Sequence, residues 1–94
     1  MTPDSVPSFP RGVKYRLDAA RGAWVLLTPE RAMMPDENAQ AVLSGIDGTR
    51  TVGDIVNDLA ARYQAPADVI MADVLELLSD LAARGVIVDR SEGA

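Results

Sequence analysis

Apolar and polar residues alternate along the first third of the chain, which predicts strands. Residues 13–17 read Val-Lys-Tyr-Arg-Leu, and a period of two is typical of a half-buried strand. A turn over residues 18–22 leads into residues 24–28, which are apolar enough to predict a central strand. After a turn at Pro29 and Glu30, a short third strand is predicted over Arg31–Met34. It ends at Pro35, because proline has no amide hydrogen to donate to a sheet.

From residue 36 onward, the apolar residues take the spacing of helices. Asp36 is a predicted N-cap, and the helix after it is expected to stop at Gly48. Its buried stripe is predicted to be Ala39, Val42, Leu43 and Ile46.

A second helix is predicted to begin after Thr51. This residue is a good N-cap, and Asp54 stands where a capping box needs its second side chain. Apolar residues then recur at helical spacing as far as Tyr63, which we expect in the core.

The third helix is predicted from Pro66 to about Arg84, with Gly85 at its end. Its core stripe is Ile70, Val74, Leu77, Leu78 and Leu81, and a second apolar line runs beside it through Met71, Leu75 and Ala82. Two interpretations of this wide stripe stay open. Neighbouring elements of the same chain cover all of it, or part of it lines a groove for another molecule.

With a short closing strand over residues 86–88, the order is three strands, three helices and one strand. This order predicts an α+β fold. We expect a winged helix-turn-helix-like domain with a three-stranded N-terminal antiparallel sheet, then three helices and a short C-terminal strand. Residues 1–10 contain three prolines and are expected to be a flexible tail or linker. The domain is expected over residues 11–90, with a disordered tail over residues 91–94.

Composition excludes several classes of function. The 94 residues include no cysteine and no histidine, which removes disulfides, thiol nucleophiles, imidazole catalysis and most zinc sites. The acidic residues lack metal-loop spacing. We therefore expect no enzyme, no catalytic residue, no metal and no cofactor. The sequence shows neither a secretory signal nor a membrane-spanning run, so a cytoplasmic location without a membrane partner is expected.

The charge is distributed unevenly along the chain. Residues 1–31 carry five basic and three acidic residues, whereas residues 32–94 carry four basic and eleven acidic residues. A helix that reads DNA needs Arg, Lys, Asn or Gln near its start, but residues 65–73 offer only two acids among apolar residues. We expect no nucleic-acid partner, and a DNA-binding or regulatory winged helix-turn-helix domain is the alternative function.

The short third strand suits peptide binding by strand addition. An exposed strand offers free backbone groups to a second chain, and its side chains add selectivity. In Arg31–Met34 two methionines provide flexible, adaptable contacts; the other interpretation is that both fill the core. Trp24 is expected to anchor the core. A free edge also favours self-association, so a monomer or weak homodimer is expected.

A set of short motifs resembles the PqqD family of pyrroloquinoline quinone (PQQ) biosynthesis. The motifs span residues 11–88, and their order and spacing carry the likeness. They are Arg11-Gly12-Val13, Trp24-Val25-Leu26-Leu27, Pro29-Glu30-Arg31, Asp47-Gly48, Thr51-Val52-Gly53-Asp54-Ile55, Tyr63, Asp73-Val74-Leu75-Glu76-Leu77-Leu78 and Gly85. Met33-Met34-Pro35 departs from the family pattern, in which proline rarely interrupts this apolar segment.

The resemblance implies a recognition element for ribosomally made, modified peptides (a RiPP recognition element). Such a peptide chaperone binds the precursor peptide PqqA and presents it to the radical SAM enzyme PqqE, which cross-links a glutamate and a tyrosine of the peptide. In this family the peptide lies beside the third strand and against the third helix. Mapped onto this sequence, the implied peptide-binding residues are Arg31, Ala32, Met33, Met34, Met71, Leu75 and Ala82.

Overall fold

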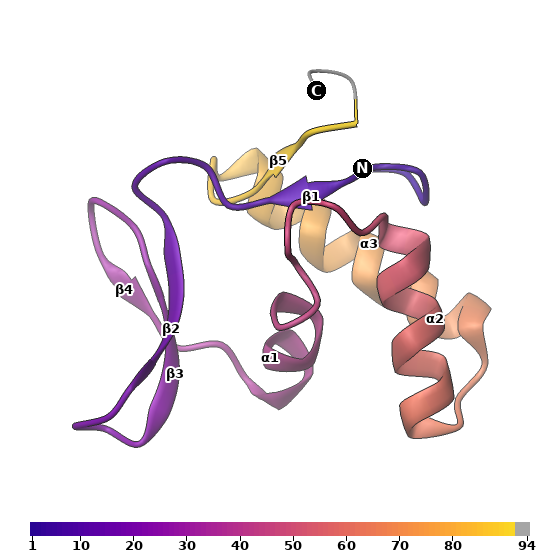
Figure 1. Cartoon of the computed structure of the whole chain (residues 1–94), viewed down its shortest axis with the longest axis horizontal. Coiled ribbons are helices and arrows are strands. Elements are labelled where there is room, and N and C mark those ends of the chain that lie inside the picture. The colour runs from indigo at the N-terminus through magenta and orange to yellow at the C-terminus, as the bar shows by residue number, and fades with distance from the viewer. Residues whose placement is uncertain (92–94) are drawn as a thin grey trace.

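The computed structural model describes residues 1–91, in which two small antiparallel sheets accompany three helices (Figure 1). One sheet has the strand order β2-β3-β4, and the other pairs β1 with β5. The predicted α+β class is confirmed. Most of the predicted tail over residues 91–94 lies outside the described residues. The elements are β1 (Pro7–Ser8), β2 (Lys14–Asp18), β3 (Ala23–Leu27), β4 (Ala32–Met33), α1 (Glu37–Leu43), α2 (Val52–Tyr63), α3 (Ala67–Ala83) and β5 (Val88–Asp89).

The predicted three-stranded N-terminal sheet is present as β2, β3 and β4. Strands β2 and β3 form a hairpin whose register runs from Lys14 opposite Leu27 to Asp18 opposite Ala23. At its tip, the Asp18 carboxylate accepts the backbone N–H of Ala20 over 3.0 Å, an interaction typical of Asx turns. Strand β4 continues the sheet, with Met33 opposite Leu26.

The N-terminal segment differs from the expected flexible tail. Strand β1 pairs with β5, so that Pro7 lies opposite Asp89. Ser5 and Pro7 are buried. The carbonyl oxygens of Ser5 and Pro3 accept the backbone N–H groups of Val52 and Gly53, each over 2.9 Å. Pairing with β5 and these two bonds hold the segment in place, and the bonds satisfy N–H groups at the start of α2 that lack partners within the helix.

The first helix begins as predicted and ends early. Asp36 caps it by accepting the backbone N–H of Ala39 over 2.8 Å. The helix stops at Leu43 instead of reaching Gly48. After Leu43 the chain tightens into turns, in which the N–H of Gly45 donates to the oxygen of Val42.

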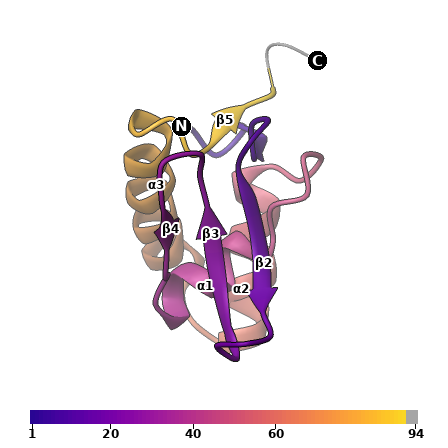
Figure 2. The ribbon, with the colours of Figure 1, turned by 90° about the vertical axis from the view of Figure 1, so that its left-hand side faces the viewer.

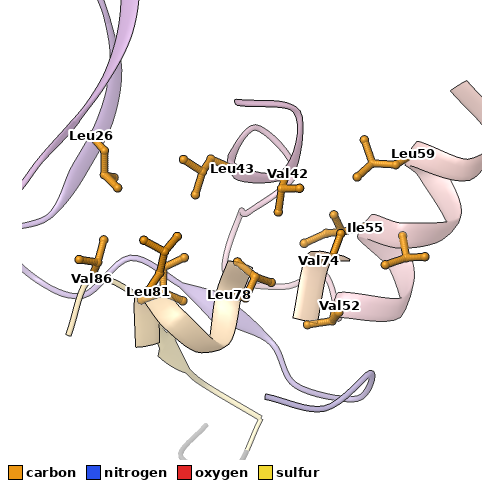
Figure 3. Packing of buried hydrophobic residues seen from close by; sticks show 12 residues of the cluster. Leu26, Val42, Leu43, Val52, Ile55, Leu59, Val74, Leu78, Leu81 and Val86 are labelled. Atoms are coloured by element: carbon orange, nitrogen blue, oxygen red, sulfur yellow. The ribbon is translucent and has the colours of Figure 1, made fainter. Parts of the chain in front are cut away.

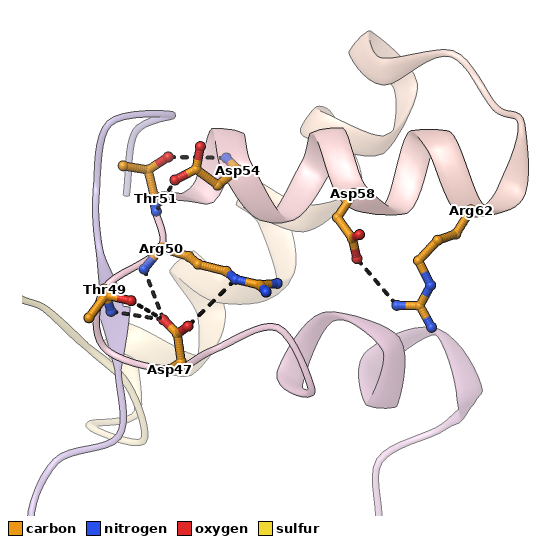
Figure 4. A network of polar contacts seen from close by, with 7 residues as sticks. All are labelled: Asp47, Thr49, Arg50, Thr51, Asp54, Asp58 and Arg62. Carbon is orange, nitrogen blue, oxygen red and sulfur yellow. Dashed lines mark hydrogen bonds and ion pairs between the residues drawn. The ribbon is translucent and has the colours of Figure 1, made fainter.

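The second helix has the predicted capping box in full (Figure 4). The Thr51 hydroxyl accepts the backbone N–H of Asp54 over 3.0 Å, and the Asp54 carboxylate accepts the backbone N–H of Thr51 over 3.1 Å. In the loop before it, Asp47 accepts the backbone N–H groups of Thr49 and Arg50, each over 2.9 Å. These bonds lower the pKa of Asp47 to about 2.

Side chains from β3, all three helices and the segment before β5 form the core (Figure 3). The predicted closing strand over residues 86–88 is shifted, because Val86 and Ile87 are buried in this core and pairing starts at Val88. The cluster consists of Leu26, Val42, Leu43, Val52, Ile55, Val56, Leu59, Val74, Leu78, Leu81, Val86 and Ile87.

Two residues expected in the core are exposed. Tyr63 is 62% exposed, because it is the last residue of α2 and lies past the region where that helix is covered. Trp24 is 39% exposed, near the hairpin tip that projects from the helices (Figure 1). Its ring stacks on Tyr15, with the ring centroids 5.0 Å apart. Within residues 1–91, no helix has the length and apolar character needed to cross a membrane.

Candidate functional site

Strand β4 is an edge of the three-stranded sheet. In Figure 2 it is the strand drawn on the side of α3, with β2 at the opposite edge. The backbone N–H of Thr28 donates to the oxygen of Arg31 over 2.9 Å. Bonded positions alternate along an antiparallel ladder, so Met33 is the next residue of β4 bonded to β3. The N–H and C=O of Ala32 therefore point to the open edge.

Local interactions at both ends limit β4 to two residues. The Thr28 hydroxyl donates to the oxygen of Arg31 over 3.0 Å and accepts the Arg31 backbone N–H over 3.2 Å, which closes the turn before β4. At the other end, Pro35 and the N-cap Asp36 turn the chain into α1.

The side chains of Arg31–Met34 differ in their surroundings. Arg31 and Ala32 are exposed, whereas Met33 is half-buried and packs against the core. Met34 is 58% exposed, and a guanidinium N–H of Arg21 donates to its sulfur over 3.7 Å. Met33 therefore partly fills the core, which was one of the two interpretations of the methionines, whereas Met34 is a surface residue.

The three predicted site residues of α3 share one flank of that helix. Met71, Leu75 and Ala82 are half-buried, and at 3.6 residues per turn they lie to one side of the buried line Val74, Leu78 and Leu81. Ser79 is one turn from both Leu75 and Ala82. Its hydroxyl oxygen lies 3.2 Å from the N-terminal amino group, which donates to it. The start of the chain therefore lies next to this flank.

The opposite flank of α3 lines an open hollow, here called the α1–α3 hollow, with a volume of about 420 Å³. It lies where α1, the end of α2 and the first half of α3 meet. None of the seven predicted site residues lines it. Its lining residues are Asp36, Asn38, Ala39, Ala41, Val42, Leu59, Tyr63, Ala65, Ile70, Asp73, Val74 and Leu77.

Three small residues that form this hollow are visible in the sequence, but their role becomes clear only in the tertiary structure. Ala39, Ala41 and Ala65 are small side chains at positions where a larger residue would fill the space between helices. In a linear sequence, an alanine in a helical segment indicates only that the segment favours a helix. Only the packing of three helices turns them into the wall of a hollow.

Helix α3, which lines one side of this hollow, is acidic. Helix α3 carries Asp68, Asp73, Glu76 and Asp80 and has no basic residue. Asp80 pairs with Arg84, at 3.2 Å between carboxylate and guanidinium. In the described part of the chain, Asp73 has neither an ion pair nor a side-chain hydrogen bond. No group of three or more acidic side chains within residues 1–91 is arranged to hold a metal ion.

The comparisons with known proteins agree on one family. The family described as "Coenzyme PQQ synthesis protein D (PqqD)" matches residues 23–87. A protein of Bradyrhizobium diazoefficiens named "PqqA binding protein" is 44% identical over 88 residues, covering 94% of this chain and 85% of that protein.

The likeness extends to a longer protein and to a solved structure. The "Bifunctional coenzyme PQQ synthesis protein C/D" of Methylorubrum extorquens is 45% identical over 87% of this chain, which matches 22% of that protein's length. The solution NMR structure of the PqqD truncation of Methylobacterium extorquens PqqCD, described as a functional and stand-alone RiPP recognition element, superimposes with a TM-score of 0.79. It is 42% identical, and the match covers 94% of each chain.

One of these relatives is named for binding PqqA and another is described as a RiPP recognition element, and the prediction that the chain is not an enzyme is confirmed. The family match covers more than half of the chain, and the sequence and structural matches cover nearly all of it. The chain belongs to the PqqD family of PQQ biosynthesis.

Proposed function

We propose that this protein binds the precursor peptide PqqA by strand addition at β4 and presents it to the radical SAM enzyme PqqE. The observation that carries the proposal is the open edge at Ala32, whose backbone N–H and C=O point away from β3. Exposed strand edges are templates for an added strand. A relative at 44% identity is named for binding this peptide.

The proposed peptide-binding residues are Arg31, Ala32, Met33 and Met34 on the edge, with Met71, Leu75 and Ala82 on α3. Backbone bonds at Ala32 supply affinity that depends little on sequence, whereas the methionine side chains adapt to apolar residues of the peptide. The half-buried residues of α3 would contact the face of the peptide that is turned toward the helix.

The chemistry of cross-linking is proposed to reside in PqqE. Binding one peptide and one enzyme together raises the effective concentration of the peptide at the enzyme. The four acids of α3 and its lack of basic residues argue against DNA as an alternative ligand. A cytoplasmic location and a monomer or weak homodimer remain predictions within this proposal.

An NMR titration of ¹⁵N-labelled protein with unlabelled PqqA tests the binding step. Strand addition predicts the largest amide shifts at residues 31–34, because a new hydrogen bond changes the shielding of the Ala32 amide directly. Shifts on one flank of α3 would then show which side of the helix the peptide contacts. No shift anywhere at a large excess of PqqA would refute the proposed ligand.

A second experiment tests the presentation step. PqqE and PqqA are incubated with and without the protein, and the cross-linked peptide is quantified by mass spectrometry. We expect product to depend on the protein at low PqqA concentration and to depend less on it as PqqA is raised, since the protein acts by effective concentration. Product formation that is independent of the protein at every PqqA concentration would contradict the presenting role.

A further inference from the structure

We propose that the α1–α3 hollow binds a second part of the peptide, beyond the part that pairs with β4. This second anchor is an apolar side chain next to a lysine or arginine. The inference rests on the proposed peptide binding and adds the chemistry of the segment that enters this hollow. The occupant is thus a continuation of the same peptide strand past the end of β4.

The interior of the hollow suits an apolar side chain. Nine of its twelve lining residues are apolar or aromatic, and Ile70 and Leu77 are only half-buried by the protein itself. A volume of about 420 Å³ is within the range of about 300–1,000 Å³ that is usual for ligand sites. Tyr63, at 62% exposed, stands at its side as an aromatic surface available for a further contact.

The charged residues of the lining are all acidic. Asp36 and Asp73 line the hollow and no basic residue does. Asp36 already accepts one backbone N–H as the cap of α1, whereas Asp73 is exposed and has no partner within residues 1–91. Arg62, the basic residue of α2, is paired with Asp58 at 3.3 Å (Figure 4). A basic residue beside the apolar anchor therefore meets uncompensated negative charge.

The hollow begins a few residues after the open edge at Ala32. Strand β4 ends at Met33, and Asp36 is already a lining residue. A strand spans about 3.3 Å per residue, so a peptide paired at Ala32 reaches the start of α1 within a few residues. One extended chain can therefore occupy both surfaces.

The test measures dissociation constants of PqqA for matched variants by fluorescence anisotropy. Asp73→Asn removes the charge at the hollow, and Asp68→Asn makes the same change on the same helix away from it. Ala39→Phe fills the hollow, and Ala72→Phe places the same side chain on an exposed part of α3. Circular dichroism confirms that each variant is folded.

We expect Asp73→Asn to weaken PqqA binding about two- to fivefold and Ala39→Phe about tenfold or more, with little change for the two controls. A PqqA in which the neighbouring basic residue is replaced by glutamine should bind wild type and Asp73→Asn equally. If PqqA shifts the β4 amides but both hollow variants bind it as wild type does, the second anchor is refuted and strand addition stands. A PqqA sequence without an apolar residue beside a lysine or arginine would refute it as well. If wild type fails to bind PqqA, both proposals fall.

Discussion

The backbone N–H of Val52 donates to the carbonyl oxygen of Ser5 over 2.9 Å, although these residues are far apart in the sequence. Val52 is the first residue of α2, and the first N–H groups of a helix have no acceptor inside it. Ser5 and Pro3 supply two acceptors, and the Thr51 hydroxyl of the capping box accepts the next backbone N–H, that of Asp54. The first residues of the chain are thus part of the cap of α2.

This cap predicts slow hydrogen exchange at the start of α2. The amides of Val52 and Gly53 should exchange slowly compared with the exposed first-turn amides of other helices, because each is bonded to the N-terminal segment. Hydrogen–deuterium exchange followed by NMR measures this directly. Deleting residues 1–5 should abolish the protection and lower the free energy of unfolding by about 1–3 kcal/mol. Fast exchange of both amides in the intact chain would contradict the cap.

The open edge predicts a specific effect of Ala32→Pro. Proline removes the N–H that points away from β3 and leaves the bonds of Met33 to β3 in place. PqqA binding should weaken about three- to tenfold, because at least one intermolecular hydrogen bond is lost. Ala32→Val, which keeps the N–H, is the control and should bind nearly as wild type does. Equal affinities for the two variants would show that this amide is not used.

The hydroxyl of Tyr15 predicts a stabilising substitution. It is buried and has no hydrogen-bond partner within the described residues, although the ring itself stacks on Phe9 and Trp24. Tyr15→Phe removes the unsatisfied group and keeps both ring contacts. The free energy of unfolding in urea should rise by up to about 1 kcal/mol. A clear decrease would mean that the hydroxyl is hydrogen bonded in solution.

Two carboxylates predict that acid weakens the fold. Backbone N–H groups of Arg50 and Thr49 lower the pKa of Asp47 from 3.8 to about 2. Bonds from Ser91 and Ser5, with the Val6 N–H, hold the pKa of Asp89 well below its ordinary range. Because both values are depressed, this stabilisation is complete above about pH 4 and is lost as pH falls through the folded-state pKa.

Carboxyl ¹³C titration by NMR measures both pKa values. Asp47→Asn should reduce the loss of stability between about pH 4 and pH 2. The matched variant is Asp58→Asn, which removes an exposed carboxylate paired only with Arg62 one turn away. An identical acid dependence in Asp47→Asn and wild type would refute the assigned role of Asp47.

Local patterns predicted the elements whose cause is local. The capping box at Thr51, the N-cap at Asp36 and the end of β4 before Pro35 all appear in the structure because each depends on residues within a few positions. The hairpin of β2 and β3 follows from alternation on either side of a turn. The edge strand at Ala32 could be predicted for the same reason.

The features that sequence reasoning missed depend on contacts between distant segments. Strand β1 looks like a proline-rich tail until β5 lies beside it, and the bond from the Val6 N–H to the Asp89 carboxylate joins the two ends of the chain. Helical spacing places Tyr63 in line with core residues of α2, but whether a neighbour covers it depends on where α1 and α3 lie.

The sequence by itself determined strands β2 to β4, the starts of the three helices, the class of the fold and the acidic character of the helices, because these follow from periodicity, capping and composition. The tertiary structure decided which flank of α3 lies next to the start of the chain and which flank lines the α1–α3 hollow. Both flanks carry apolar residues of similar character, so no local pattern distinguishes them. Their exposure is set by the placement of the other helices and of the N-terminal segment, since burial depends on neighbours that are remote in sequence.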